Sequence, residues 1–328
     1  MSQPVIAENL TTLPKHLRRV GMPEGLVQVV EAVALAGKAI AQKVRRARID
    51  DVIGVAGNVN VQGEVQEKLD VLSDELMHHC LAECSSAAVY ASEEQESPVV
   101  FREAGQGGAY CVLADPLDGS SNIDVAVSVG TIFSVLPNGA PDGQAAQAVL
   151  QTGNAQIAAG YILYGSSVVM VLATERGVDM YVLDPVLGDF VLVQEGLRVP
   201  DEKKIYSVNE AYANDFDAGV QAYLEYAHGA GYAARYIGSM VADVHRTLLK
   251  GGVFLYPATA KAPAGKLRLM YEGNPMALVI ERAGGAAYAG PERLLDVAPE
   301  ALHQRIPVLL GSSAEVEHVR RHSGAAVR

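Results

Sequence analysis

Acidic residues gather where an apolar run of the chain ends. The segment Leu113–Asp124 reads LADPLDGSSNID and overlaps the end of the hydrophobic run AYCVLA. Pro116 fixes its own φ and pushes Asp115 toward an extended conformation, so that Asp115 and Asp118 can converge on one point beyond a strand end. These carboxylates and the backbone carbonyl of Leu117 are hard oxygen ligands, which Mg²⁺ prefers. The segment therefore predicts a site for a hard cation.

The residues that follow offer groups that bind phosphate. Gly119, Ser120 and Ser121 present flexible backbone N–H groups and hydroxyls, which form an anion-binding nest where a turn or helix begins. Metal ligands next to groups that donate hydrogen bonds to a phosphate are typical of metal-assisted phosphoryl transfer. An ordinary polar turn is the competing interpretation, because Asp, Pro, Gly, Ser and Asn dominate turns.

Two further acidic clusters lie elsewhere in the chain. Glu93 and Glu94 follow a short predicted strand at residues 87–91, and Asp70 lies in the sequence KLD. Exposed glutamates are common, so either cluster alone indicates only solvated charge. Their combination with the DPLDGSS segment favours a catalytic centre.

Apolar periodicity predicts the elements that position these groups. Helical spacing extends over residues 26–44 and about 64–83. PVVFRE and AYCVLA, which flank AGQGG, are predicted to pair as a hairpin, as are VDMYVLD and DFVLVQ around PVLG. Glu67, Asp70 and Asp74 share one face of the second helix, whereas the predicted buried face consists of Val65, Leu69, Leu72, Leu76 and Cys80.

The pattern changes near Pro200. Strand-like runs fill the middle of the chain before this point, whereas helices predicted at about residues 215–226, 239–249 and 274–283 alternate with short strands after it. Such alternation favours a layered domain. We therefore predict an α/β protein of two domains, with helices and a sheet in residues 1–197 and an α/β arrangement in residues 198–328.

Composition restricts the classes of function. The 328 residues include 26 basic and 38 acidic side chains, and the formal net charge of −12 argues against binding to nucleic acid. No apolar run approaches the about 18 residues of a membrane span, and MSQPVIAENL lacks the pattern of a secretory signal. Three cysteines do not indicate a disulfide scaffold, although His79, Cys80 and Cys84 leave a zinc site as an alternative to buried cysteines. These features predict a reduced cytosolic protein.

Further sequence segments lie along most of the chain, from about Asn60 to Ala287, and those in its C-terminal part are more specific than the DPLDGSS segment. They are NVQGE, KLDVLSDEL, SEE, DPLDGSSNID, VSVGTIF, AAGYILYG, YSVNE, RYIGSMVADVHRTLLKGGVFLYPA, GKLRLMYEGNPMA and ERAGGAA. In these segments the chain resembles the class I fructose-1,6-bisphosphatases. DPLDGSS alone marks a wider superfamily of lithium-sensitive, Mg²⁺-dependent phosphatases that includes inositol monophosphatases.

The resemblance implies a layered α-β-α-β-α sugar phosphatase fold and hydrolysis of the 1-phosphate of fructose 1,6-bisphosphate, in gluconeogenesis or the Calvin cycle. It implies about two or three Mg²⁺ ions per subunit, with Mn²⁺ as an alternative. Asp70 and Glu94 would orient and deprotonate the attacking water. Glu64 matches a position that is commonly aspartate and would be a further ligand beside the other implied metal ligands, which are Glu93, Asp115, Leu117 through its carbonyl, Asp118 and Glu272.

The resemblance also implies how the substrate is held. Asp118, Gly119, Ser120 and Ser121 would bind the 1-phosphate together with a metal. Arg235 would reach the 6-phosphate from a neighbouring subunit of a homotetramer. The remaining contacts to the sugar and the 6-phosphate are implied for Asn209, Tyr212, Tyr236, Tyr256 and Lys266.

Two alternatives and one regulatory expectation remain. The first alternative is a sedoheptulose-1,7-bisphosphatase or a dual-specificity enzyme, and the second is a non-catalytic sugar-phosphate sensor, which would have lost a ligand or base. Animal-type relatives bind AMP through a Lys-Tyr pair, an arginine and a threonine-bearing turn. The matching positions here are Ala109-Tyr110, Pro137 and the sequence GMPEG, so we expect weak or absent inhibition by AMP.

Overall fold

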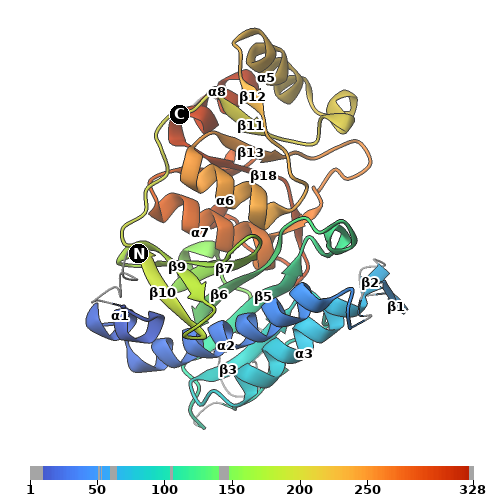
Figure 1. Ribbon diagram of the computed structural model, residues 1–328. Coiled ribbons are helices and arrows are strands. Elements are labelled where there is room, and N and C mark those ends of the chain that lie inside the picture. The colour runs from blue at the N-terminus through green and yellow to red at the C-terminus, as the bar shows by residue number, and fades with distance from the viewer. Residues whose placement is uncertain are drawn as a thin grey trace, which may run out of the picture.

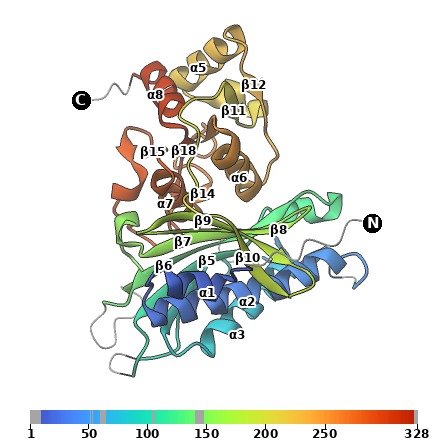
Figure 2. The same cartoon turned by 60° about the vertical axis from the view of Figure 1, so that its left-hand side comes forward.

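The computed structural model describes residues 10–50, 52, 54–59, 65–103, 106–139 and 148–324, with only the backbone for residues 55–59, 65 and 66. Two sheets are stacked, with helices on both outer sides and between them (Figures 1 and 2). None of the helices in these residues is long and apolar enough to cross a membrane.

Helices form three of the five layers. On one outer side lie α1 (Leu13–Arg19), α2 (Glu24–Arg46) and α3 (Lys68–Ala82). The layer between the sheets consists of α6 (Met240–Lys250) and α7 (Asn274–Arg282), and the other outer layer of α5 (Ala218–Gly229) and α8 (Ser313–His322). The predicted α-β-α-β-α layering is confirmed.

The first sheet has eight strands in the order β10-β9-β8-β7-β6-β5-β3-β4. Neighbouring strands of this sheet run antiparallel, except for β3 and β5, which run parallel. The predicted pairing of VDMYVLD with DFVLVQ is correct. The other predicted hairpin is wrong, because β3 lies between β4 and β5 and pairs with both. The strands are β3 (Ala87–Ser92), β4 (Val99–Val100), β5 (Tyr110–Asp118), β6 (Val129–Pro137), β7 (Ala158–Tyr164), β8 (Val168–Thr174), β9 (Gly177–Asp184) and β10 (Asp189–Gln194).

The second sheet has the order β12-β11-β13-β18-β15-β16, and all its strands come from the chain after residue 204. They are β11 (Ile205–Ser207), β12 (Ala233–Ala234), β13 (Val253–Tyr256), β15 (Ala286–Ala289), β16 (Glu292–Arg293) and β18 (Val308–Gly311). Two small ribbons, β1 with β2 and β14 with β17, complete the described strands; they span Val55–Val59, Val65–Glu67, Leu267–Arg268 and Arg305–Ile306.

Helix α3 differs from its prediction in start and in orientation. It begins at Lys68, because residues 65–67 form β2 and the side chains of Glu67 and Asp70 form a capping box with each other's backbone. The buried face consists of Leu69, Asp70, Ser73, Asp74, Met77 and Leu81, whereas the predicted Leu72, Leu76 and Cys80 are only half-buried. The predicted face is therefore correct at Leu69 but incomplete, because α3 packs against both α2 and the strands β3 and β5 and also buries two carboxylates. The half-buried predicted residues pack against the edge of the core.

Apolar side chains fill each space between layers. One core lies between the outer helices and the first sheet, a second surrounds α6 and α7, and a third lies under α5 and α8. Asp217 accepts hydrogen bonds from two backbone N–H groups at the start of α5, which places the helix start after the predicted residue 215.

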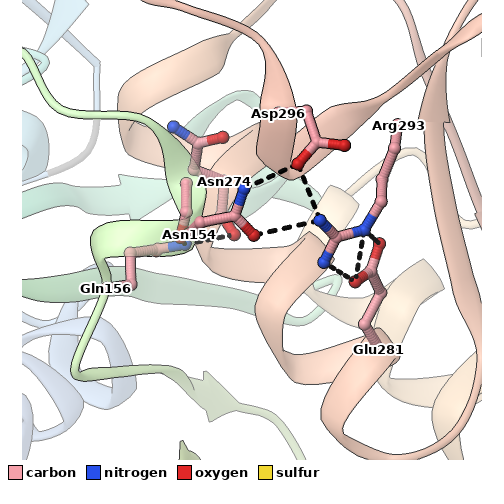
Figure 3. A network of polar contacts seen from close by, with 7 residues as sticks. Asn154, Gln156, Asn274, Glu281, Arg293 and Asp296 are labelled. Carbon is pink, nitrogen blue, oxygen red and sulfur yellow. Dashed lines mark hydrogen bonds and ion pairs between the residues drawn. The ribbon is translucent and has the colours of Figure 1, made fainter.

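A network of polar side chains joins the half of the chain that forms the first sheet to the half that forms the second sheet. Figure 3 shows Arg293 between Glu281 on α7 and Asn154, which lies in the short helix η2 (Gly153–Ala155). The guanidinium binds both carboxylate oxygens of Glu281, with contacts from 2.6 to 3.1 Å, and donates to Asn154 Oδ1 at 3.0 Å. Asp296 accepts from both Arg293 and Asn154. The two halves are thus held in one orientation around the layer of α6 and α7.

Candidate active site

Three buried carboxylates meet at the ends of the parallel strands β3 and β5. Glu93 directly follows β3, and its N–H donates to the carbonyl of Ala114 on β5 at 3.1 Å, which aligns it with Asp115. Glu272 comes from the π-helical turn η4 (Leu269–Gly273) before α7, a type of turn found often at functional sites. One oxygen of each carboxylate lies within 4.8 Å of the others. Three predicted metal ligands are therefore brought together, and we call them the carboxylate triad.

The charge of the triad makes it fit a hard cation. Burial, followed by the negative charge of Glu93, raises the pKa of both Asp115 and Glu272 well above the ordinary value. Arg268 contacts Glu93 Oε1 at 3.1 Å, and its backbone N–H donates to Glu272 Oε2 at 2.5 Å. One guanidinium does not balance three carboxylates, so a divalent cation among these oxygens would relieve the repulsion.

Sequence reasoning did not identify Arg268. The signal was available, because a charged residue within the apolar run LRLMY is costly to bury without a partner. The structure buries Arg268 and provides that partner in Glu93.

Asp118 is buried beside the triad but is not part of it. Its Oδ2 accepts from the backbone N–H of Val241 at 2.7 Å and from Ser239 Oγ at 3.3 Å. Burial raises the pKa of Asp118 to about 6, against these hydrogen bonds, which lower it. Leu117, also buried, donates its N–H to Asp115 Oδ1 at 3.0 Å and holds the DPLD turn in shape. The start of α6 therefore supports the predicted metal-binding turn.

The predicted phosphate-binding residues lie at the next bend of the chain. Gly119 has φ +78°, and a Cβ there would lie 2.9 Å from Ser239 Oγ, so both conformation and space require glycine. Ser120 begins the short helix η1 (Ser120–Val125) and lies close to the carboxylate of Asp70. Ser121 is exposed. Both serines line a cavity of about 170 Å³.

Asp70 and Glu94 lie near each other at the edge of the triad. Asp70 is 6% exposed in the first turn of α3, and Glu67 N–H donates to its Oδ2 at 2.9 Å. Burial, together with the negative charge of Glu94, raises the pKa of Asp70 to about 7. Glu94 is half-buried, and its charge also raises the pKa of Asp115. The two carboxylates come from different elements, α3 and the end of β3.

A second, less charged pocket opens beside the triad. Its volume is about 220 Å³, and its lining includes the predicted residues Asn209, Tyr212, Tyr256 and Lys266 and also Lys261, which sequence reasoning did not identify. Lys266 Nζ lies 5.4 Å from the centre of the Tyr212 ring. Burial, followed by the nearby negative charge of Glu272, raises the pKa of Tyr256, so this pocket residue lies near the triad.

Tyr236 and Arg235 lie on the exposed rim rather than in the pocket lining. Tyr236 lies close to the side chain of Asn209, and its partial burial raises its pKa to about 12. Arg235 is exposed and donates to the carbonyl of Ala234 at 2.7 Å. Glu64 lies outside the described residues. Among the described residues, the zinc alternative has no support, since no group of three candidate ligands includes Cys80 or Cys84.

Two family models match almost the whole chain. The model described as "Fructose-1-6-bisphosphatase, N-terminal domain" matches residues 12–195, and the model described as "Fructose-1-6-bisphosphatase, C-terminal domain" matches residues 199–323.

Individual proteins give the same picture. The chain is 48% identical to fructose-1,6-bisphosphatase isozyme 2 of Bos taurus over 89% of this chain and 87% of that protein. It is 44% identical to fructose-1,6-bisphosphatase class 1 of Chlorobium luteolum over 94% and 96%. The crystal structure of Leishmania major fructose-1,6-bisphosphatase in holo form superposes with a TM-score of 0.92 at 38% identity, covering 96% of this chain and 99% of that one.

Proposed function

Because the chain belongs to the fructose-1,6-bisphosphatase family, we propose that it hydrolyses the 1-phosphate of fructose 1,6-bisphosphate to give fructose 6-phosphate and phosphate. The observation that carries this proposal is the combination of a buried carboxylate triad with a pocket lined by lysines and tyrosines. Tyr256 lines that pocket and is close enough to Glu272 of the triad to be influenced by its charge. A molecule with an anion at each end of a small polar body suits this arrangement.

The two phosphates would meet different kinds of partner. We place the 1-phosphate over the backbone from Asp118 to Ser121, where N–H groups and hydroxyls act as donors. The 6-phosphate would take hydroxyl, amide and ammonium donors, which are strong partners for a phosphate dianion. These donors are Asn209, Tyr212, Tyr236, Tyr256 and Lys266.

Metal ligation is part of the proposal. We assign Glu93, Asp115, Asp118 and Glu272, with the carbonyl of Leu117, to about two or three Mg²⁺ ions, or Mn²⁺ in their place, and Glu64 as a further ligand. When bound, such ions would supply positive charge to the phosphate oxygens and lower the pKa of a coordinated water.

Asp70 and Glu94 would orient the attacking water and accept its proton. As a water oxygen bonds to phosphorus, the bond between phosphorus and the ester oxygen breaks, and the ester oxygen becomes the hydroxyl of the product sugar once it is protonated. The water proton passes to the carboxylate pair. A base whose pKa lies near neutral pH is well suited to this transfer, and the pKa of Asp70 is about 7.

Assembly, domain division and location complete the proposal. We propose a homotetramer in which Arg235 reaches the 6-phosphate bound by a neighbouring subunit, because this arginine is exposed and is not among the residues lining its own pocket.

We also propose a domain boundary near residue 197, which the two matched segments support. The unpaired cysteines Cys80, Cys84 and Cys111 support a cytosolic location.

Phosphate release from three substrates tests the function. Fructose 1,6-bisphosphate, sedoheptulose 1,7-bisphosphate and an inositol monophosphate are compared at saturating Mg²⁺, and we expect the highest kcat/KM for the first. Preference for the sedoheptulose substrate would reassign the enzyme to the same reaction on a longer sugar. Tight binding of a sugar bisphosphate with no phosphate release would identify a sensor and contradict the proposal.

A further inference from the structure

A second buried carboxylate on α3 is not used by the site described above. Asp74 lies one helical turn after Asp70 and is 8% exposed. Its Oδ1 accepts from the hydroxyl of Tyr90 at 2.8 Å, and its Oδ2 accepts from Gln95 Nε2 at 2.6 Å. Because a buried carboxylate is costly unless its oxygens are bonded, these two donors hold Asp74 in one orientation.

Gln95 directly follows the pair Glu93-Glu94, and it is held from two sides. Its side chain is bound by Asp74 on α3. Its backbone carbonyl lies 3.0 Å from Nε2 of His303, which comes from the second half of the chain, between α7 and β17. A carbonyl only accepts, so His303 Nε2 carries the proton, and burial lowers the pKa of His303, which keeps the ring neutral.

The contact between Asp74 and Gln95 links the two elements that carry the catalytic carboxylates. Asp70 belongs to α3, whereas Glu93 and Glu94 follow β3. A strand end that continues into a loop is free to shift, and metal ligands tolerate displacements of only about 0.5 Å. The hydrogen bonds on both sides of Gln95 act against such a shift.

We propose that Asp74, Gln95 and His303 form a positioning network that fixes Glu93 and Glu94 relative to Asp70, and that the network thereby sets the metal affinity of the site and the rate of water attack. The inference rests on the proposed function and names residues that touch neither substrate nor metal. Groups that hold metal ligands in this way typically contribute 10- to 100-fold to metal affinity or activity.

The hydrogen bond between Asp74 and Gln95 can be tested by exchanging its donor and its acceptor. In Asp74→Asn, one oxygen can still accept from Tyr90, and the new amide nitrogen regains a partner if the Gln95 amide turns over and presents its oxygen as the acceptor. In Gln95→Glu, two carboxylates oppose each other. The double variant Asp74→Asn/Gln95→Glu restores one donor and one acceptor with the direction of the bond reversed.

The experiment measures metal binding and kinetics separately. Titration calorimetry of the metal-free protein with MnCl₂ should give a Kd about 10- to 100-fold higher for Gln95→Glu, and kcat should fall by a similar factor, whereas Asp74→Asn should lose less of both. KM for fructose 1,6-bisphosphate should stay within about twofold, because the sugar pocket lies elsewhere. The double variant should recover most of both losses. Glu75→Gln, an exposed neighbour on the same helix, is the control and should match the wild type.

Two outcomes would overturn the inference. One is a Gln95→Glu variant that keeps both wild-type metal affinity and wild-type kcat. The other is a double variant no better than Gln95→Glu although thermal unfolding shows both to be folded. Gln95→Ala, at a half-buried loop position, should show the same losses with little risk to folding. If the metal titrations follow the expected pattern while no variant or wild type releases phosphate, the proposed function fails and the network stands.

Discussion

At the scale of single residues, Asp70 shows how surroundings set the chemistry of a carboxylate. Burial and the charge of Glu94 raise its pKa to about 7, which makes it a base suited to neutral pH. We expect Asp70→Asn to lower kcat by about 10²- to 10⁴-fold, because a general base is lost. KM should change little, since no phosphate contact is removed. Steady-state kinetics at saturating Mg²⁺ measures both values, and a variant with near-full turnover would show that the role is misassigned.

The same substitution should change how stability depends on pH. An acid whose pKa is higher in the folded protein than in the unfolded chain binds more protons when folded. The stability that it contributes is therefore present at low pH and is lost as the pH rises through the folded value, which for Asp70 is about 7. An asparagine does not ionise, so Asp70→Asn should gain stability relative to the wild type as the pH rises.

Urea unfolding of both metal-free proteins at several values between about pH 5 and pH 8 tests this expectation. The difference in unfolding free energy between variant and wild type should move in favour of the variant across that range. A difference that is the same at every pH would contradict the raised pKa of Asp70.

At the scale of elements, the start of β5 and the end of β6 bear on regulation. Tyr110 and Pro137 are directly opposite each other in this pair of strands, and Gly25 at the start of α2 packs against the Tyr110 ring. The positions at which animal-type relatives would hold the phosphate of AMP therefore lie together, but they are occupied by Ala109, Tyr110 and Pro137. Tyr110 can stack or donate one hydrogen bond, but it carries no positive charge to neutralise a phosphate.

We expect AMP to be a weak inhibitor or none at all. Two missing charged contacts, each worth about 1.5–3 kcal/mol, are enough to abolish a micromolar site. Titration of activity with AMP at saturating Mg²⁺ is the measurement. Potent, cooperative inhibition at micromolar AMP would falsify this expectation.

At the scale of the whole molecule, the proposed role of the exposed Arg235 would link activity to assembly. If it serves a neighbouring subunit, Arg235→Ala should raise KM about 10- to 100-fold, because a charge-assisted contact to phosphate is lost. Arg321→Ala, which removes an exposed arginine paired with Glu317 on α8, is the matched control and should leave KM unchanged.

Subunit exchange then tests the crossing itself. Arg235→Ala is mixed with Asp118→Asn, which lacks a proposed metal ligand but keeps its arginine. In mixed oligomers some sites would combine intact metal ligands with a donated arginine, so activity at low substrate should exceed the sum of the two parents. A mixture that merely averages its parents would place the arginine in its own subunit's site.

Local sequence patterns alone predicted the positions of several helices and strands of this protein and the type of its site. The apolar run before Asp115 indicates the strand β5, and the proline, glycine and serines around Asp118 predict a turn at its end, with metal and phosphate binding as the functional interpretation. Helical periodicity located α2, α6 and α7 to within a few residues, because the apolar stripe of a helix is written in consecutive turns of sequence. The matching segments along the chain identified the family.

Tertiary structure decided the rest. The 3.6-residue period indicates that α3 is a helix, but the apolar residues alone suggested only part of its buried face, since α2 and the first sheet together also cover the side that carries Asp70 and Asp74. The parallel pairing of β3 with β5 depends on a crossover past β4 that no local pattern encodes. Arg268 acquires its partner Glu93 only when residues 175 positions apart are brought together, because the desolvation and pairing of charge depend on three-dimensional packing rather than on order along the chain.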